Sequence, residues 1–526
     1  MPLPSTERVA IVGGGCTGIA CFWALQNSIH DVHLFEASSI LGGRIKAIPY
    51  EHDKNRVDVN TESPLFNFEN SPNLVSMLGH LGVATSPVPF YFNSSDGSNT
   101  FEWFGSLLKS LMYKPWILCN IETYRLLADF IWLKYWALDA LASKSWVWAL
   151  GTSDSQASLS THDYLANEGY SGTFYDGYLS PLFSTLWKTN AGRFLPQLPF
   201  DALIHCLNDY QILSPHHTAS QWQRINMGVH HFVKSMTREF SPAKVHLKAR
   251  VREVSAIGKK GYILLASDAQ PMYFDHVVFA VDSQEALRLL HPKLSSGERD
   301  IIQSFKAAQN VAVLHSDVML SPGVSRSWPA HDYIIPQSGH NQHHCCSILE
   351  PATGKSSLTH NVNTLQDIST CVFGRIFITL NPFTPPHPHL VQGVWEFTDP
   401  EPNPEYLYAQ TRLHSIQNKR GLSYGFRWTG RGFLEDSVTA GLEIAVDHLG
   451  AKVPFEIDHR HALDLSPFSL GLGITEHVVR LILVFGRVYF QLLELGLILL
   501  STSWLAFPNV RTLIMRWNKD RAFSQS

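Results

Sequence analysis

The sequence predicts an α/β protein with a discontinuous, Rossmann-like nucleotide-binding domain, a mixed α+β second domain and an apolar helical C-terminal tail. Three observations predict this fold class. A strand, a glycine-rich turn, a helix and a second strand follow one another within residues 8–36. Glycines and an acid pair precede another helical pattern at 430–445, and a long uncharged run near the C-terminus predicts the tail.

The first segment holds every part of a dinucleotide-binding unit. An apolar strand at 8–12 precedes a glycine-rich turn, a helix at 19–27 and a second strand at 31–35. Three glycines of the turn stand in Gly-x-Gly-x-x-Gly spacing: Gly13, Gly15 and Gly18. In order, they permit a tight turn, a close approach of backbone to a pyrophosphate, and close packing of the helix on the sheet. Glu36 follows the second strand, where an acid accepts hydrogen bonds from a ribose and disfavours a 2′-phosphate.

Two later segments fit the same domain. Residues 245–281 read as short strands, namely VHL, VREVS and YILLAS, followed by the buried run HVVFAV at 276–281. We expect a small meander followed by an apolar strand. In 430–445, acids in a first helical turn suit the helix dipole, which is a structural explanation for them.

Composition excludes several classes of protein. The 526 residues carry a net charge of −4 without a basic block, which argues against nucleic-acid binding because phosphate neutralisation supplies most of that affinity. With 45% hydrophobic residues, most of the chain is not disordered. Seven scattered cysteines imply no disulfide framework. The chain enters a strand-like run almost at once, so we expect no signal peptide and a cytoplasmic location.

Gly42-Gly43-Arg44 extends the first unit and carries a family resemblance. Two glycines let the chain pass beside a second stretch of the cofactor, and Arg44 can lie near its phosphates. The segment VAIVGGGCTGIACFWALQNSIHDVHLFEASSILGGR resembles the FAD-binding start of the flavin-containing amine oxidase superfamily. Over about residues 1–450 the chain is most similar to predicted NAD/FAD-binding, amine-oxidase-like proteins of bacteria, plants and fungi. Shared stretches include LSPLFSTLW (179–187) and GFLEDSVTAGL (432–442).

The resemblance implies FAD as cofactor and names further contacts. It places the backbone of Val251 near the adenine, and it makes 430–445 the second FAD motif, in which Glu435 and Asp436 begin a helix directed at the flavin. The predicted cofactor-binding set is Gly13, Gly15, Gly18, Glu36, Gly43, Arg44, Val251, Glu435 and Asp436. Because the C-terminal motif contains no cysteine or histidine, we expect non-covalent FAD. The sequence does not identify a catalytic residue.

Four positions depart from the family pattern. Asn60-Thr61-Glu62-Ser63 replaces an Asp-Thr-Gly-Phe type sequence, Met227-Gly228 replaces a Gly-Gly pair, and Leu434 replaces a histidine. Phe426-Arg427 stands where relatives carry a small Gly-Ala pair. Two of these changes put bulk where backbone approaches the flavin. They motivate an alternative, a non-catalytic flavoprotein or scaffold that uses the fold for membrane or partner binding.

The resemblance also divides the chain. We expect the FAD-binding domain at 1–85, 222–300 and 395–450, and the substrate domain at 86–221 and 301–394.

The tryptophan-rich stretch 107–150 is either a buried helical core or an apolar entrance for a lipid-like substrate. His340 and the cluster His343-His344-Cys345-Cys346 look like metal ligands, but adjacent ligands rarely chelate one tetrahedral ion, so we expect a surface loop and no metal.

The tail, 456–526, is a possible membrane anchor. Residues 478–507 are strongly apolar, with Arg480, Arg487 and Glu494 spaced seven apart along one stripe of a helix. The uncharged part is short for a span, and the basic residues after 510 disfavour one with a cytoplasmic FAD domain. We expect an interfacial helix or a re-entrant hairpin on the cytoplasmic side, with a helix packed on the protein's own surface and a true span as the alternatives.

The expected function is that of an FAD-dependent oxidoreductase of the amine oxidase type. It would remove a hydride equivalent from an amine or an apolar, lipid-like small molecule. Tyr424, Phe426 and Trp428 either frame the substrate nitrogen or belong to the core. We expect no nucleic-acid partner.

Overall fold

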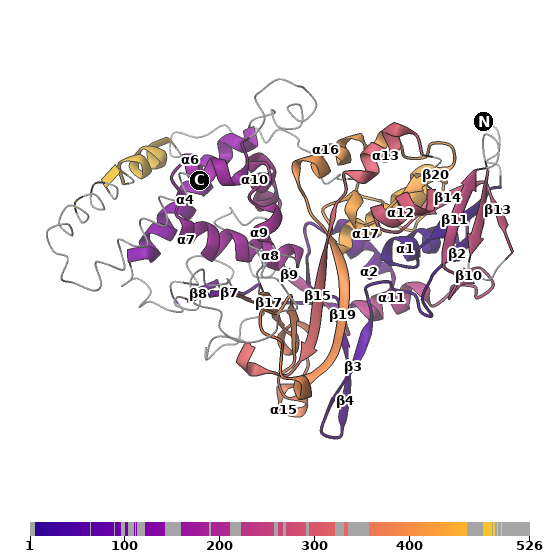
Figure 1. Cartoon of the computed structure of the whole chain (residues 1–526), viewed down its shortest axis with the longest axis horizontal. Helices are drawn as coiled ribbons and strands as arrows, with labels where there is room; N and C mark the ends of the chain where they lie inside the picture. Colours follow the sequence, from indigo (N-terminus) through magenta and orange to yellow (C-terminus); the bar gives the residue numbers. More distant parts are fainter. Residues whose placement is uncertain are drawn as a thin grey trace. The chain divides into compact units, whose positions relative to one another are not determined.

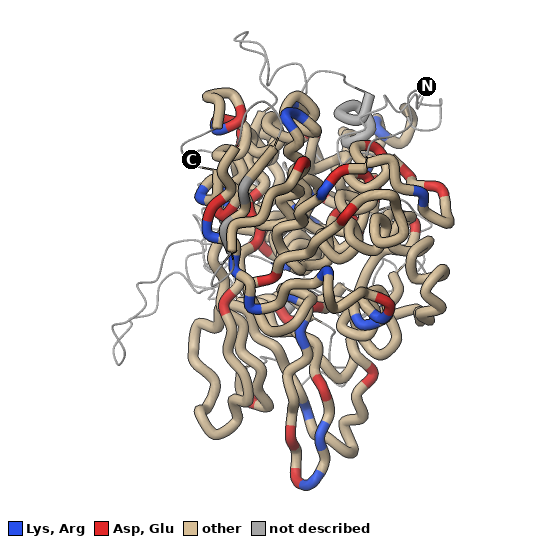
Figure 2. The backbone as a smooth tube through the Cα atoms, turned by 90° about the vertical axis from the view of Figure 1, so that its right-hand side faces the viewer, with Lys and Arg blue, Asp and Glu red and all other residues tan. Residues whose placement is uncertain are grey.

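The computed structural model consists of two compact units, each formed from separated stretches of chain. The first unit comprises Met1–Phe90, Thr218–Asp332 and Ser357–Asp464, and the second Tyr91–His217, Tyr333–Ser356 and Leu465–Ser526. The structure describes residues 6–63, 65–88, 90–95, 100–103, 110, 112, 121–142, 159–188, 191–210, 222–256, 261–266, 270–290, 294–320, 331–334, 357–459, 477–486, 488, 489, 492 and 496. The expected His/Cys cluster lies outside these residues. Figure 2 shows basic and acidic residues interspersed along the described backbone.

A five-stranded parallel sheet is the centre of the first unit (Figure 1). Its order is β10-β2-β1-β14-β20, with β1 Arg8–Val12, β2 Asp31–Phe35, β10 Val245–His246, β14 His276–Phe279 and β20 Leu422–Tyr424. Four of the five residues in β1 and in β2, and all of β14, are buried, as expected for a parallel sheet covered on both faces. Strands from three distant parts of the chain therefore form one sheet.

Residues 245–281 fold differently from the expectation in two respects. The expected meander exists, but its strands are β11 Val251–Ala256, β12 Tyr262–Ala266 and the unforeseen β13 Met272–Phe274. The VHL stretch is not part of it, because β10 pairs in parallel with β2. Alternation alone predicted a strand there but did not determine its partner.

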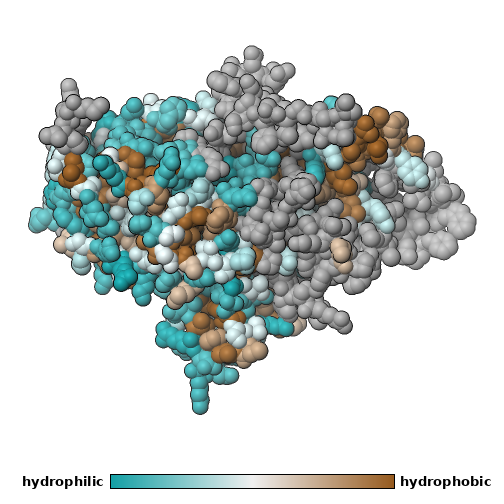
Figure 3. Space-filling view, turned by 180° about the vertical axis from the view of Figure 1, so that it is seen from behind, coloured by the Kyte–Doolittle hydropathy of each residue, from teal (hydrophilic) through white to brown (hydrophobic). Residues whose placement is uncertain are grey.

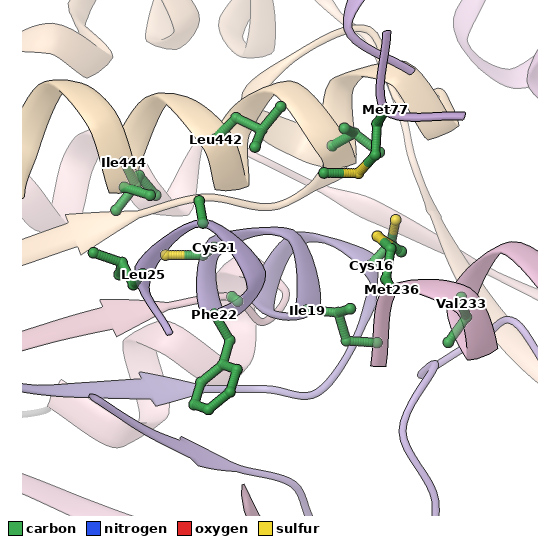
Figure 4. Packing of buried hydrophobic residues seen from close by; sticks show 14 of the residues in the cluster. Cys16, Ile19, Cys21, Phe22, Leu25, Met77, Val233, Met236, Leu442 and Ile444 are labelled. Carbon is green, nitrogen blue, oxygen red and sulfur yellow. The ribbon is translucent and has the colours of Figure 1, made fainter. Parts of the chain in front are cut away.

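Helices cover the central sheet. They are α1 Cys16–Leu25, α2 Pro72–His80, α11 Val229–Thr237 and α17 Leu434–Glu443, which continues into η8 Ile444–His448. α1 begins three residues before the expected helix, with Gly15 as its N-cap. Nearly all of its side chains are buried, so it packs on more than one side. Figure 4 shows Leu442 and Ile444 on one side of α1 and Phe22 directed to another.

The first unit contains further sheets. One includes the neighbouring strands β19-β15-β18-β17, with β15 Ala307–His315, β17 Ser357–Asn361, β18 Phe377–Leu380 and β19 Val391–Pro400. Ala47–His52 and Asn55–Asn60 form the hairpin β3–β4, and β9 (Trp222–Ile225) lies between β5 (Leu65–Asn67) and β6 (Thr85–Pro87). β16 (His331–Ile334) crosses the boundary between the two units in the chain.

The remaining helical segments of the first unit are short. They are α12 Ser283–Leu290, α13 Ser296–Gln303, η4 Val318–Leu320, α14 Val362–Gln366, α15 Thr370–Phe373, η5 Pro388–Leu390, α16 Pro404–Arg412, η6 Leu413–Ser415 and η7 Arg427–Thr429.

The described part of the second unit is largely helical. It contains α4 Ile121–Ala142, α6 Thr161–Asn167, α7 Gly172–Phe174, η2 Tyr175–Leu179, α8 Ser180–Trp187, α9 Ala191–Phe194, α10 Phe200–Asp209 and the hairpin β7 (Phe92–Ser95)–β8 (Thr100–Trp103). Trp132 and Trp136 stack on α4 with ring centroids 3.8 Å apart.

The compact units divide the chain differently from the expected functional ranges. Residues 301–332 and 357–394 belong to the first unit, together with the parallel sheet, because β15 and β19 pair along their whole lengths. The assignment of FAD-binding and substrate-binding roles to particular ranges stays a prediction. None of the helices among the described residues is long and apolar enough to cross a membrane.

Candidate functional site

The glycine-rich turn between β1 and α1 has three different surroundings at its three predicted glycines. Gly13 has φ +109°, and a Cβ there would lie 2.4 Å from the Ala280 carbonyl oxygen. A Cβ on Gly18 would lie 1.9 Å from the Gly13 carbonyl oxygen, so only glycine lets the helix start this close to the strand. Apart from its chain neighbours, no atom of the described residues lies within 4 Å of a Cβ added at Gly15. The open space is therefore at the glycine expected to face a pyrophosphate.

The start of α1 has features that suit the binding of an anion. No side chain caps the helix, and its first turn contains no acid. The Thr17 hydroxyl is buried and has no hydrogen-bond partner among the described residues. Uncapped N–H groups and the positive end of the helix dipole favour a negatively charged group at this place.

Glu36 and the second glycine pair adjoin this turn. One carboxylate oxygen of Glu36 accepts a hydrogen bond from the Gly14 N–H at 2.7 Å, and the other accepts one from Ser38 at 2.7 Å. Each carboxylate oxygen can accept a second hydrogen bond, so a ribose hydroxyl remains compatible with this arrangement. The Gly42 N–H donates to the Gly14 carbonyl at 2.8 Å, and a Cβ on Gly43 would lie 3.1 Å from the Gly15 Cα. The structure thus brings Gly43 against the backbone of the turn at Gly15.

Val251 lies at the start of β11, close to the end of the central sheet that carries Glu36. Its side chain is buried, and the N–H of Ala249, two residues earlier in the chain, donates to the Glu36 carbonyl at 2.9 Å. The backbone around Val251 is therefore next to the acid expected to hold the ribose.

α17 packs against α1 and thereby joins the two ends of the predicted cofactor domain. A Cβ on Gly441 would lie 2.4 Å from the Thr17 carbonyl oxygen and 2.9 Å from the Ala20 Cβ. Such proximity is possible only because glycine has no side chain. Leu434, at the position of the family's histidine, packs against the hydrophobic core.

The two acids at the start of α17 have protein partners. The two oxygens of Glu435 accept hydrogen bonds from the Asn73 and Leu74 N–H groups at 3.0 and 2.7 Å, so Glu435 caps α2. Asp436 accepts one from the Phe433 N–H at 2.7 Å. These contacts give both acids a structural role, and their contact with a cofactor stays a prediction.

Arg44 points into a cluster of buried charges. Its guanidinium donates to Asp399 and, at 3.0 Å, to the Thr398 carbonyl, and it lies 3.5 Å from Glu62. Arg427 lies 3.7 Å from the same Glu62 oxygen and 3.2 Å from the same Asp399 oxygen. Sequence reasoning missed Asp399, because nothing along the chain relates it to Arg44. We call Arg44, Glu62, Asp399 and Arg427 the four-charge cluster.

Two of the residues that depart from the family pattern contact each other, and a third has a local partner. Glu62 and Arg427 share the four-charge cluster. Asn60 accepts a hydrogen bond from the His230 N–H at 3.0 Å, and a Cβ on Gly228 would lie 2.1 Å from the Asn60 Nδ2. Met227 keeps the left-handed backbone of a glycine position, with φ 60°, and its side chain is exposed. Glu62 and Arg427 therefore accommodate each other, and Asn60 is held by the start of α11.

The aromatic residues near 424–428 belong mostly to the core. Tyr424 is fully buried and stacks on Phe279, and Trp428 packs on Phe305 while its Nε1 donates to the Val281 carbonyl at 3.0 Å. Phe426 alone is half-buried. Among the described residues no group of three or more histidine, cysteine or acidic side chains is placed to hold a metal.

Glu435 generates a pH prediction. Burial raises its pKa from 4.5 to about 7, so the folded state retains the proton more strongly than the unfolded chain. This contribution to stability is complete below pH 4.5 and is lost as the pH rises through about 7, by about 1.4 kcal/mol per unit of pKa shift. Thermal unfolding should show the melting temperature of the wild type falling relative to that of Glu435→Gln between about pH 5 and pH 8. The exposed Glu405→Gln is the control, and parallel profiles for wild type and Glu435→Gln would contradict the prediction.

Comparisons with known proteins show what this chain is similar to. A family model described as flavin containing amine oxidoreductase matches residues 16–318. A comparison with curated protein sequences gives no match. Among solved structures, cyclohexylamine oxidase from Brevibacterium oxydans is similar with a TM-score of 0.55 and 14% identity, over 84% of this chain and 99% of the other.

Two further structures share the fold. Putrescine oxidase, in a structure with putrescine bound, has a TM-score of 0.55 and 14% identity over 85% of this chain and 99% of the other. A CLA-producing fatty acid isomerase from P. acnes has a TM-score of 0.53 and 12% identity over 84% of this chain and 98% of the other. The family match covers more than half of the chain and begins within the glycine-rich turn, at Cys16. The chain therefore belongs to the flavin containing amine oxidoreductases and is an FAD-dependent oxidoreductase of the amine oxidase type.

Proposed function

We propose that the first unit binds FAD non-covalently and that the enzyme removes a hydride equivalent from the carbon next to nitrogen in a small amine. The observation that carries this proposal is the open space at Gly15, next to an uncapped helix start. Bound FAD would supply the two-electron acceptor, and the protein supplies binding, orientation and exclusion of water.

The chain's own residues have separable tasks in this proposal. The first-turn N–H groups of α1 bind the diphosphate, Glu36 accepts hydrogen bonds from the ribose, and the backbone at Val251 lies on the adenine side. Gly43 keeps the second loop close to the turn without filling the open space. Glu435 and Asp436 orient α17 through their capping hydrogen bonds. The expected ranges 1–85, 222–300 and 395–450 for cofactor binding, and 86–221 and 301–394 for the substrate, remain part of the proposal.

An amine is favoured over a lipid-like substrate. The family description names amines, and two similar structures are named for oxidation of an amine. An apolar, lipid-like substrate is the second candidate, supported by the similar fold of a fatty acid isomerase and by the stacked tryptophans on α4. A non-catalytic scaffold is not favoured, because the family match and the intact glycine-rich turn both point to a working flavin site.

We further propose that the tail holds the protein at the cytoplasmic face of a membrane. Within the tail, the structure describes a helix at 477–486 and residues 488, 489, 492 and 496. The rest of 478–507 lies outside the described residues. Arg480 donates to the Tyr135 carbonyl at 2.5 Å and lies over the Trp136 ring. Leu481, Ile482 and Phe485 are 58%, 63% and 68% exposed. Figure 3 shows hydrophobic residues gathered where Figure 1 draws this helix, as an interfacial segment requires.

The function is tested by spectroscopy on purified protein. We expect flavin absorbance, release of FAD on simple denaturation, and anaerobic loss of the oxidised flavin band when a suitable primary amine is added. Unsaturated fatty acids serve as the comparison series. A protein that stays colourless and takes up no added FAD would exclude this function.

Gly15→Ala tests the proposed position of the cofactor. The backbone at Gly15, with φ −76° and ψ −179°, accepts alanine, so the melting temperature of the FAD-free protein should fall only by the small cost of alanine at a helix N-cap. The added methyl group would occupy the open space, so FAD affinity, measured by quenching of flavin fluorescence, should fall at least about tenfold.

The matched control is Gly18→Ala. Its methyl group would meet the Gly13 carbonyl, so it should lower the melting temperature of the FAD-free protein as well. Unchanged FAD affinity in Gly15→Ala would place the diphosphate elsewhere.

The tail is tested by co-sedimentation with anionic phospholipid vesicles. Leu481→Ser combined with Phe485→Ser should reduce the bound fraction several-fold, because two exposed apolar side chains would no longer enter the interface. The same pair of changes should leave FAD binding unaltered. Equal sedimentation of wild type and variant would argue against the anchor.

A further inference from the structure

The four-charge cluster contains the two charged residues, Glu62 and Arg427, among the departures from the family pattern. Glu62 and Asp399 are 4% and 3% exposed, and the side chains of Arg44 and Arg427 are 25% and 11% exposed. Each carboxylate uses one oxygen to contact both guanidiniums. The second oxygen of Asp399 is buried and has no hydrogen-bond partner among the described residues. Two positive and two negative charges balance to zero.

The cluster is anchored on the cofactor turn from three directions. Arg44 follows Gly43, which lies against Gly15. Thr61, next to Glu62, donates to the Arg44 carbonyl at 2.7 Å. Gly425, two residues before Arg427, would place a Cβ 3.3 Å from the Thr17 Cγ2 on the first turn of α1. The charges therefore belong to the wall of the site and not to a remote surface.

The cluster also lies close to Cys16, the first residue of α1, because two of its charges change the pKa of the Cys16 thiol. Burial raises the pKa of its thiol to about 12, while the charge of Arg427 lowers that pKa and the charge of Glu62 raises it. Both departures thus act at the start of the helix that receives the phosphates, with opposite signs.

We propose that Glu62 and Arg427 are a reciprocal pair of positioning residues that keeps the wall of the FAD site electrically neutral, so that Arg44 does not act as a free phosphate-neutralising charge. This inference rests on the proposed function, because it concerns the same FAD site. Arg427 and Arg44 both contact the two acids, Glu62 and Asp399. The negative charge of Glu62 balances the positive charge that Arg427 adds. Removal of Glu62 leaves a net positive cluster, and removal of Arg427 leaves a net negative one.

The two single neutralising substitutions should therefore act in opposite directions. Glu62→Gln should tighten FAD binding about tenfold, since an extra positive charge attracts the diphosphate across partly buried protein. It should also raise the midpoint potential of the bound flavin, because a positive charge stabilises the electron-rich reduced form. Arg427→Gln should weaken binding by about the same factor and lower the potential. The double variant Glu62→Gln/Arg427→Gln restores neutrality and should return both values close to wild type.

The experiment is titration of the FAD-free full chain with FAD, followed by fluorescence, and redox titration of the loaded protein, both at one fixed pH for all variants. Arg427→Lys keeps the charge but not the two-acid contact, so it should lower the melting temperature while FAD affinity stays within about twofold. The exposed pair Lys306–Glu405, 3.1 Å apart in the same unit, supplies matched controls, and Lys306→Gln and Glu405→Gln should leave FAD binding unchanged.

The direction in which each variant changes the FAD affinity and the midpoint potential decides between the outcomes. Opposite shifts in the single variants and recovery in the double variant support the inference. Loss of affinity in both single variants, without recovery in the double, would show a purely structural cluster and overturn it. A wild-type chain that takes up no FAD would overturn the proposed function and the inference with it, whereas normal FAD uptake with unaltered affinity in the variants would overturn the inference alone.

Discussion

The close contact of α1 with α17 determines where everything else in the first unit can lie. Gly441 has no side chain, so the backbone of α17 approaches Thr17 and Ala20, and hydrophobic residues from four helices close the core around this contact. α17 in turn carries Glu435, which caps α2. A single tight helix pair thus fixes the start of the dinucleotide helix, the C-terminal motif and a third helix in one arrangement.

The glycine-rich turn is densely packed at two of its glycines and open at a third. At Gly13 and Gly18 there is no space for a side chain, because β1, α1 and β14 lie too close together. At Gly15 space is left free, and the helix start has no protein side chain as its cap. Dense packing on one side and an uncapped helix end on the other give the site rigidity and a place for an anion.

The four-charge cluster shows how an altered sequence can retain an inherited site. Glu62 and Arg427 each add a charge close to the cofactor turn, and either one alone would leave an uncompensated buried charge, which is strongly destabilising. Together with Arg44 and Asp399 they balance. The same logic applies to Asn60, whose side chain caps α11 beside Gly228. The charges of Glu62 and Arg427 and the side chain of Asn60 therefore have partners in the structure.

The sequence by itself determined the strand–turn–helix unit with Gly13, Gly15, Gly18 and Glu36, and the helix start at Glu435, because these depend on local spacing and backbone geometry. Only the tertiary structure decided the partners. It paired β10 with β2, turned Glu435 and Asp436 toward backbone amides, and joined Arg44 to Asp399, some 355 residues away. No periodicity encodes such contacts, since they arise when separate segments meet around one core and buried charges must be neutralised there.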